Sequence, residues 1–415
     1  MTDTNKTSLT RESLPGLNRR YRAERRFHLV GKMAVAFSLA FLTFLIGSIV
    51  YQGIGAFFQT EVRLEVPQEM IAEHGDDGFT LLRQSMLHNL PDAKGRSARR
   101  EAYKMAGEGS DIELLSAIAD QQTQAAVVTV WIPVSDDIDM AYKSDFAPDM
   151  LGSFSDRQKG WLDTWVADDR LRMSFNTGFL VNGDSRDPER AGIGGALMGS
   201  IFTLVVCLVL SFVIGILAAI YLEEFAPKNK LTAFLEVNIN NLATVPSIIF
   251  GLLGLAVFLN TFGLPRSSAL VGGMVLSLMT LPTIIIASRV ALQSVPPSIR
   301  EAALGLGATH IQAVFHHVLP LALPGMLTGT ILGMARALGE TAPLLMIGMV
   351  AFIADPPSSF MDPTSALPVQ VYLWADSPER AFAEKTSGAI IVLLLFLFVM
   401  NLTAIILRKK LEKKW

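Results

Sequence analysis

Long apolar runs are the feature that most constrains this chain. A helix needs roughly 20 mostly apolar residues to cross a hydrocarbon core about 30 Å thick. Since lipid cannot satisfy free backbone groups, such runs must be helical. The predicted spans are residues 33–54, 195–220, 245–259, 269–291, 325–353 and 388–407. The sequence therefore predicts an all-α membrane core of six helices.

Composition agrees with a mixed membrane protein. Of the 415 residues, 51% are hydrophobic and 18% charged, and the mean hydropathy is +0.40. Those values are too apolar for an ordinary soluble protein and too polar for a chain made only of spans. The net charge of −3 provides no basic field for nucleic acid. A single cysteine, Cys207, excludes a disulfide framework or Cys-based zinc site within one chain.

Basic residues near both ends indicate the orientation. Arginines cluster at positions 19–26 and basic residues at 408–414, and such flanks mark the cytoplasmic side. Both termini are then cytoplasmic, and the first run is an uncleaved anchor. The expected segments are a basic N-terminus (1–30), a first transmembrane helix (31–56), an inserted domain on the outer face (57–190), a membrane core (191–408) and a basic tail (409–415).

The insertion at 57–190 is predicted to be an α+β domain. Helical patterns cover residues 77–90, 97–105 and 111–119, and strand patterns cover 125–133 and 172–181. Trp131, Trp161 and Trp165 are expected to supply its small core.

A polar segment at residues 294–322 separates the fourth and fifth predicted spans. Its pattern consists of Glu301, Ala302, Ala303, Gly307, Leu319 and Pro320. This spacing resembles the EAA loop of ABC importer membrane subunits, although His317 stands where an aliphatic residue is usual. The resemblance implies a short helix that docks into the ATP-hydrolysing subunit. Its coupling residues would be Arg300, Glu301, Ala302, Ala303 and Gly307. The alternative is a cytoplasmic loop with ordinary helix punctuation.

Elementary rules support a short helix here. Pro296 and Pro297 end the preceding helix. Ser298 is predicted to cap the new one in a capping box with Glu301, and Gly307 to end it. The two alanines keep one face shallow enough to enter a groove.

The chain has no motif for cradling nucleotide phosphates. Its one Gly-Lys pair, Gly31-Lys32, has Arg26 where the first glycine of a P-loop would be needed. We expect no catalytic residues, no metal and no cofactor in this chain, and ATP would be bound by partner subunits.

An arginine and a glutamate lie four residues apart in the fifth predicted span. Each such charge costs about 2.5–3.5 kcal/mol at a helix centre. Arg336 and Glu340 are either a neutralised structural pair or an anion site, because guanidinium binds phosphate oxygens in a bidentate way.

Three stretches resemble permeases for inorganic phosphate of the PstA type. They are residues 335–344, 245–252 and 367–375, and the resemblance covers residues 194–407. It implies the type I ABC importer permease fold in the bacterial inner membrane. It also implies a second, PstC-like permease subunit, PstB-like ATP-binding subunits and a periplasmic phosphate-binding protein. The outer domain would then be periplasmic, with membrane lipid around the spans and no nucleic acid as a partner.

One position departs from this family. Many relatives have an arginine where Ile286 stands. Arg289 either substitutes for it on the anion route, with Arg336 and Glu340, or is an interfacial anchor whose charge reaches the membrane surface.

Two other functions are open. The chain could import a different oxyanion, such as molybdate, tungstate or sulfate. It could also be a membrane sensor whose outer domain signals inward.

Overall fold

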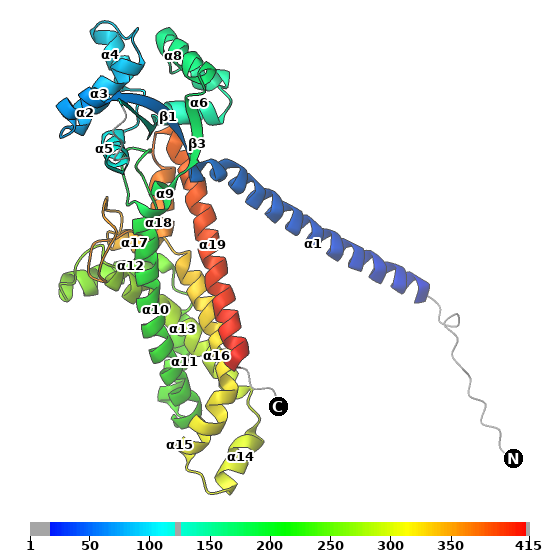
Figure 1. Cartoon of the computed structure of the whole chain (residues 1–415). Helices are drawn as coiled ribbons and strands as arrows, with labels where there is room; N and C mark the ends of the chain where they lie inside the picture. Colours follow the sequence, from blue (N-terminus) through cyan, green and yellow to red (C-terminus); the bar gives the residue numbers. More distant parts are fainter. Residues whose placement is uncertain (1–16, 121–125, 412–415) are drawn as a thin grey trace, which may run out of the picture. The chain divides into compact units, whose positions relative to one another are not determined.

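The computed structural model describes residues 17–120 and 126–411 (Figure 1). Two compact units make up the chain, Met1–Gln52 and Gly53–Trp415, and each is described by itself. In the first, α1 (Leu17–Gly53) is one continuous helix that contains the first predicted span and the basic cluster before it. The predicted basic ends, 1–30 and 409–415, lie partly outside the described residues.

Five helices among the described residues are long and apolar enough to cross a membrane. Besides α1, they are α10 (Gly194–Ile220), α13 (Ala269–Gln293), α16 (Leu319–Leu338) with the turns that precede it, and α19 (Arg380–Leu411). The predicted span at 245–259 belongs to a helix pair bent by 106°. Its parts are α11 (Lys230–Leu242), α12 (Ser247–Leu253) and a π-helical turn, Gly254–Thr261. A sixth crossing therefore exists only if this bent pair is one span.

The fifth predicted span, 325–353, is wrong in its bounds. The helical stretch runs from His310 to Leu338 and then breaks. Gly339 follows the break, and Pro343 lies in the first turn of the next short helix, α17 (Ala342–Met346). Because proline has no amide hydrogen and disfavours helical backbone before it, the helix cannot continue through this point. Later segments form α18 (Leu367–Ala375) and α19.

Small residues let the central helices approach closely. A Cβ atom at Gly329 would lie 2.2 Å from the Cβ atom of Ala287, and one at Gly325 would lie 2.7 Å from that of Ala291. Neither distance is tolerable, so α16 packs on α13 only because glycine stands at these positions.

The α/β region, residues 57–190, is built on a three-stranded antiparallel sheet of order β2-β1-β3. The strands are β1 (Phe58–Pro67), β2 (Val127–Pro133) and β3 (Leu171–Phe175). The helices are α2 (Gln68–His74), α3 (Gly78–Asn89), α4 (Arg96–Tyr103), α5 (Ser110–Asp120), α6 (Asp136–Lys143), α7 (Pro148–Leu151), α8 (Asp156–Ala167) and α9 (Thr177–Val181). Alternate residues of β1, such as Val62 and Leu64, are fully buried, as expected for a strand with one covered face.

The three predicted helices and the strand at 125–133 are present, with ends shifted by a few residues; Ala125 lies outside the described residues. Two predictions needed correction. The predicted strand 172–181 is strand only to Phe175, because Asn176 caps α9 by accepting a hydrogen bond from the Phe179 amide. Of the three tryptophans, Trp161 and Trp165 are in the core, whereas Trp131 faces the other side of the sheet under Arg172.

Candidate functional site

The polar segment at 294–322, here called the coupling segment, forms a short helix and a turn. Helix α14 spans Pro297–Gly305, with Pro296 as its N-cap and no side-chain cap. The predicted capping box of Ser298 and Glu301 is therefore absent, because the helix begins before Ser298. After Gly305 the chain turns through Gly307, whose φ is +88°. The Gly307 amide donates to Leu304 and that of Ala308 to Ala303, which is a Schellman ending.

One face of α14 is open. Glu301 and Ala302 are exposed, and the side chain of Leu306 is 91% exposed at the tip of the turn. Ala303, in contrast, is only 6% exposed. Only the first alanine of the pair can face a partner, because the helix turns the second toward its own chain. Leu304 is exposed as well, and neighbouring exposed apolar side chains on a short helix form a surface suited to docking.

Arg300 points away from that face. Its guanidinium lies 2.6 Å from the Glu224 carboxylate and donates to the backbone carbonyls of Leu292 and Val295 at 2.9 and 2.8 Å. The Glu224 side chain is only 5% exposed. Glu224 lies in the π-helical turn Tyr221–Phe225 that continues α10. Arg300 thus fixes α14 to the ends of α10 and α13 and does not itself lie on the open face.

A second contact holds the same turn. The His310 Nε2 atom lies 2.9 Å from the Glu224 carbonyl oxygen, and the rings of His310 and Phe225 meet edge to face at 5.1 Å. His310 begins α15 (His310–Ala313), directly after the open turn. Both arms of the coupling segment therefore contact the end of α10, and movement of one would displace the other.

Arg289 is neutralised by carboxylates. Its Nη2 atom lies 2.9 Å from Glu236 of α11, and its Nε atom lies 3.3 Å from Glu223 of the π-helical turn. Gln293 donates to the same Glu223 carboxylate at 3.0 Å. Two carboxylates around one guanidinium favour the anchoring interpretation of Arg289 over a free anion ligand.

Arg336 and Glu340 are only partly buried by the rest of the chain. Arg336 lies in the last turn of α16, whereas Glu340 lies beyond the helix, so the two do not share a helix face. Their closest atoms, Nε and Oε1, are 3.5 Å apart, and the Arg336 side chain is 49% exposed. A loosely paired, half-exposed guanidinium is available to an anion, unlike Arg289 and Arg300.

Sequence reasoning missed the carboxylates that hold these arginines. Glu223 and Glu224 stand next to each other at the end of an apolar run, and that position is the signal that could have drawn attention to them. Nothing in the sequence indicates that their partners lie 66 and 76 residues further on.

Comparison with known proteins fits this geometry. The family described as "Binding-protein-dependent transport system inner membrane component" matches residues 211–415, and "Domain of unknown function (DUF3333)" matches residues 15–151. A Mycobacterium tuberculosis relative, "Phosphate transport system permease protein PstA 1", is 31% identical over 225 residues, which cover 53% of this chain and 72% of the relative. "Probable ABC transporter permease protein YqgI" of Bacillus subtilis is 28% identical over 248 residues, 56% of this chain and 82% of the relative.

A solved structure of the MetNI methionine ABC transporter in an inward-facing conformation aligns with 53% of this chain and 96% of its own. It has 19% identity and a TM-score of 0.43, so the likeness adds nothing to the assignment. The sequence relatives suffice. The chain belongs to the family of binding-protein-dependent transport system inner membrane components, and its second half is related to the PstA-type phosphate permeases.

Proposed function

We propose that this permease subunit of an ABC importer carries inorganic phosphate inward across the bacterial inner membrane. The proposal rests on the coupling segment, which has one open face and one face bonded to the membrane helices. Its outer face, with Glu301 and Leu306, is open, and its inner face is fixed to α10 through Arg300 and Glu224. A helix of this kind can receive a force from a partner and pass it to membrane helices.

Energy enters from outside this chain. PstB-like subunits bind and hydrolyse ATP, and the change in their docking cleft displaces α14. Because Arg300 bonds to Glu224 and to the last carbonyls of α13, that displacement acts on the ends of α10 and α13 together. The spans, paired with a PstC-like permease, then alternate between outward-facing and inward-facing states.

The anion follows a route past Arg336. A periplasmic phosphate-binding protein delivers phosphate to the outer side, where the α/β region also lies, while both termini stay in the cytoplasm. Arg336 offsets part of the charge of the dehydrating anion, and Glu340 holds the guanidinium until the anion displaces it. Arg289 anchors the inner ends of the spans and does not bind the anion.

Uptake by the assembled importer in liposomes tests the substrate. With ATP inside and the phosphate-binding protein outside, we expect uptake of labelled phosphate that excess molybdate, tungstate or sulfate does not suppress. Uptake of molybdate in the absence of phosphate uptake would assign a different oxyanion. A protein that shows no ATP-dependent uptake but whose α/β region changes conformation when a ligand is added would be a sensor.

A further inference from the structure

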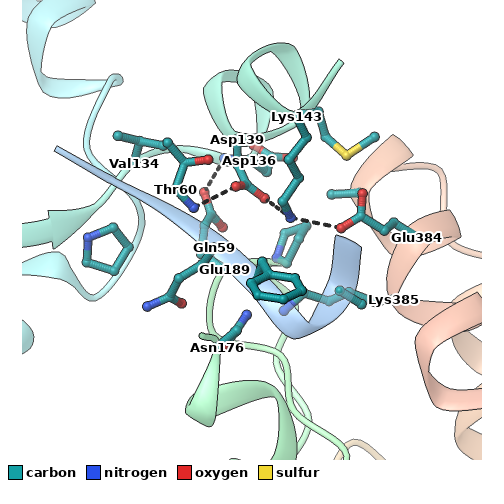
Figure 2. Close-up of a pocket in the computed structure, with 16 residues that line it drawn as sticks. Gln59, Thr60, Val134, Asp136, Asp139, Lys143, Asn176, Glu189, Glu384 and Lys385 are labelled. Carbon is teal, nitrogen blue, oxygen red and sulfur yellow. Dashed lines mark hydrogen bonds and ion pairs between the residues drawn. The ribbon is translucent and has the colours of Figure 1, made fainter. Parts of the chain in front are cut away.

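A small cavity of about 30 Å³ lies where the α/β region meets the start of α19 (Figure 2). Its lining is unusually rich in charge for a site with so little space. The charged side chains are Asp136, Asp139 and Lys143 of α6, Glu189 of the segment between α9 and α10, and Glu384 and Lys385 of α19. We call these six residues the junction cluster. Neither the apolar runs nor the coupling motif accounts for them.

A continuous chain of polar contacts crosses the junction. The Thr60 amide of β1 donates to Asp139 Oδ1 at 2.7 Å. Lys143 Nζ lies 2.6 Å from Asp139 Oδ2 and 2.8 Å from Glu384 Oε1 (Figure 2). The side chains of Lys143 and Glu384 are 12% and 14% exposed, so water does little to screen this pair. The central strand of the α/β region is thus bonded, through α6, to the first turn of α19.

The next residue of α19 ties the helix to a different element. Lys385 Nζ donates to the Ala191 carbonyl at 2.7 Å, and its side chain is buried. Ala191 stands three residues before the start of α10. Adjacent lysine and glutamate side chains therefore hold α19 to two places at once, the α/β region and the start of α10.

The start of α19 packs closely against the residues before β1. A Cβ atom at Gly388 would lie 2.6 Å from the Cβ atom of Ala56. An apolar cluster at the same junction contains residues of these segments and of α18: Ala56, Phe179, Ala191, Ile193, Ala196, Leu367, Trp374, Phe382 and Ala389. Trp374 adds a hydrogen bond to Asp184 at 2.9 Å. Buried ion pairs specify one arrangement, and the close packing below them resists sliding.

We propose that the junction cluster locks the α/β region, α19 and the start of α10 into one rigid body, so that the α/β region moves with these helices during transport. The π-helical turn that continues α10 contains Glu224, which is bonded to the coupling helix α14. One helix is therefore held at its start by the junction and at its end by the coupling segment. This inference rests on the proposed function in one respect: it assumes that α19 and α10 move during transport.

Distance measurements on the assembled importer test this lock. Spin labels would be placed at Asp163→Cys on α8 and Leu395→Cys on α19, both at exposed positions, in a chain carrying Cys207→Ala. We expect one narrow distance distribution that stays the same with and without ATP. Lys143→Glu adds a third carboxylate beside Asp139 and Glu384, and we expect the distribution to widen at least about twofold. Adding Glu384→Lys restores an attractive pair and should narrow it again.

The control is Lys159→Glu on α8, which makes the same charge change on a lysine whose nearest carboxylate, Asp156, is 3.9 Å away. It should leave the distribution unchanged. A broad distance distribution in the wild type, or a Lys143→Glu distribution as narrow as that of the wild type, would contradict the proposed lock.

If the variants do not assemble, hydrogen exchange of the wild-type importer tests the proposal instead. Helix α6 and the first turn of α19 must open together, and separate opening contradicts the proposal. A narrow distribution in an importer that ignores phosphate would reject the proposed substrate and leave the lock standing.

Discussion

An ion pair lies near each end of α10, but the surroundings of the two pairs differ. At the coupling segment, Arg300 and Glu224 form the inner side of a helix whose other face exposes Glu301 and Leu306. At the junction, Lys143 and Glu384 are enclosed by the elements that they join. The first arrangement leaves one face of its helix open, whereas the second is closed. Similar ion pairs therefore lie beside an open surface in one place and inside a closed joint in the other.

Substitutions of two glutamates in and near the coupling segment test whether its inner and outer faces differ. Glu224→Ala should lower the free energy of unfolding of this end by about 3–5 kcal/mol, because it leaves the Arg300 guanidinium without its buried partner. Glu301→Ala, on the open face, should change it by less than about 0.5 kcal/mol. Hydrogen exchange of α14 in the full chain measures both. Equal effects would remove the distinction between the inner and outer faces.

A substitution of Arg336 tests whether its half-exposed guanidinium is a ligand site. Arg336→Gln should reduce phosphate uptake about 10- to 100-fold, which corresponds to losing a charge-assisted hydrogen bond of about 1.5–3 kcal/mol. Assembly with the partner subunits should persist, since half of the side chain is exposed. Arg266→Gln, at an exposed loop position, is the matched control and should transport normally. Wild-type uptake by Arg336→Gln would reduce this residue to a structural one.

The junction should also respond to pH. Burial, together with the nearby Asp136 and Asp187 carboxylates, raises the pKa of Glu189 from 4.5 to about 7. The folded chain thus holds a proton that the unfolded chain releases between pH 4.5 and 7, so stability falls as pH rises through that window. Asp139 and Glu384 also repel the ionised form, whereas Lys143 and Lys385 attract it.

Thermal unfolding between pH 5 and 8 measures this effect. Each unit of pKa shift corresponds to about 1.4 kcal/mol, so we expect a loss of roughly 1–3 kcal/mol across the window. Glu189→Gln cannot ionise and should flatten this part of the profile. An identical pH dependence in both proteins would show that Glu189 does not control the junction.

The comparison also shows what the sequence can predict. Apolar length predicted most of the membrane helices, because hydropathy is a local property. The EAA spacing predicted α14, because proline and glycine define its ends. The bend at residues 242–247 and the break after Leu338 were missed, since the apolar pattern continues through both. The inward turn of Arg300 and the pairing of Lys143 with Glu384, 241 residues away, depend on tertiary structure and leave no local pattern.

Counting the phosphate ions imported per ATP hydrolysed by the importer in liposomes, for the wild type and for Glu301→Lys, tests the coupling role of α14 most directly. We expect the wild type to couple the two processes. The variant, folded and assembled but reversed in charge on the open face of α14, should lose uptake or hydrolyse ATP without it. An unchanged ratio in Glu301→Lys would contradict the claim that α14 passes the energy of ATP into the membrane helices.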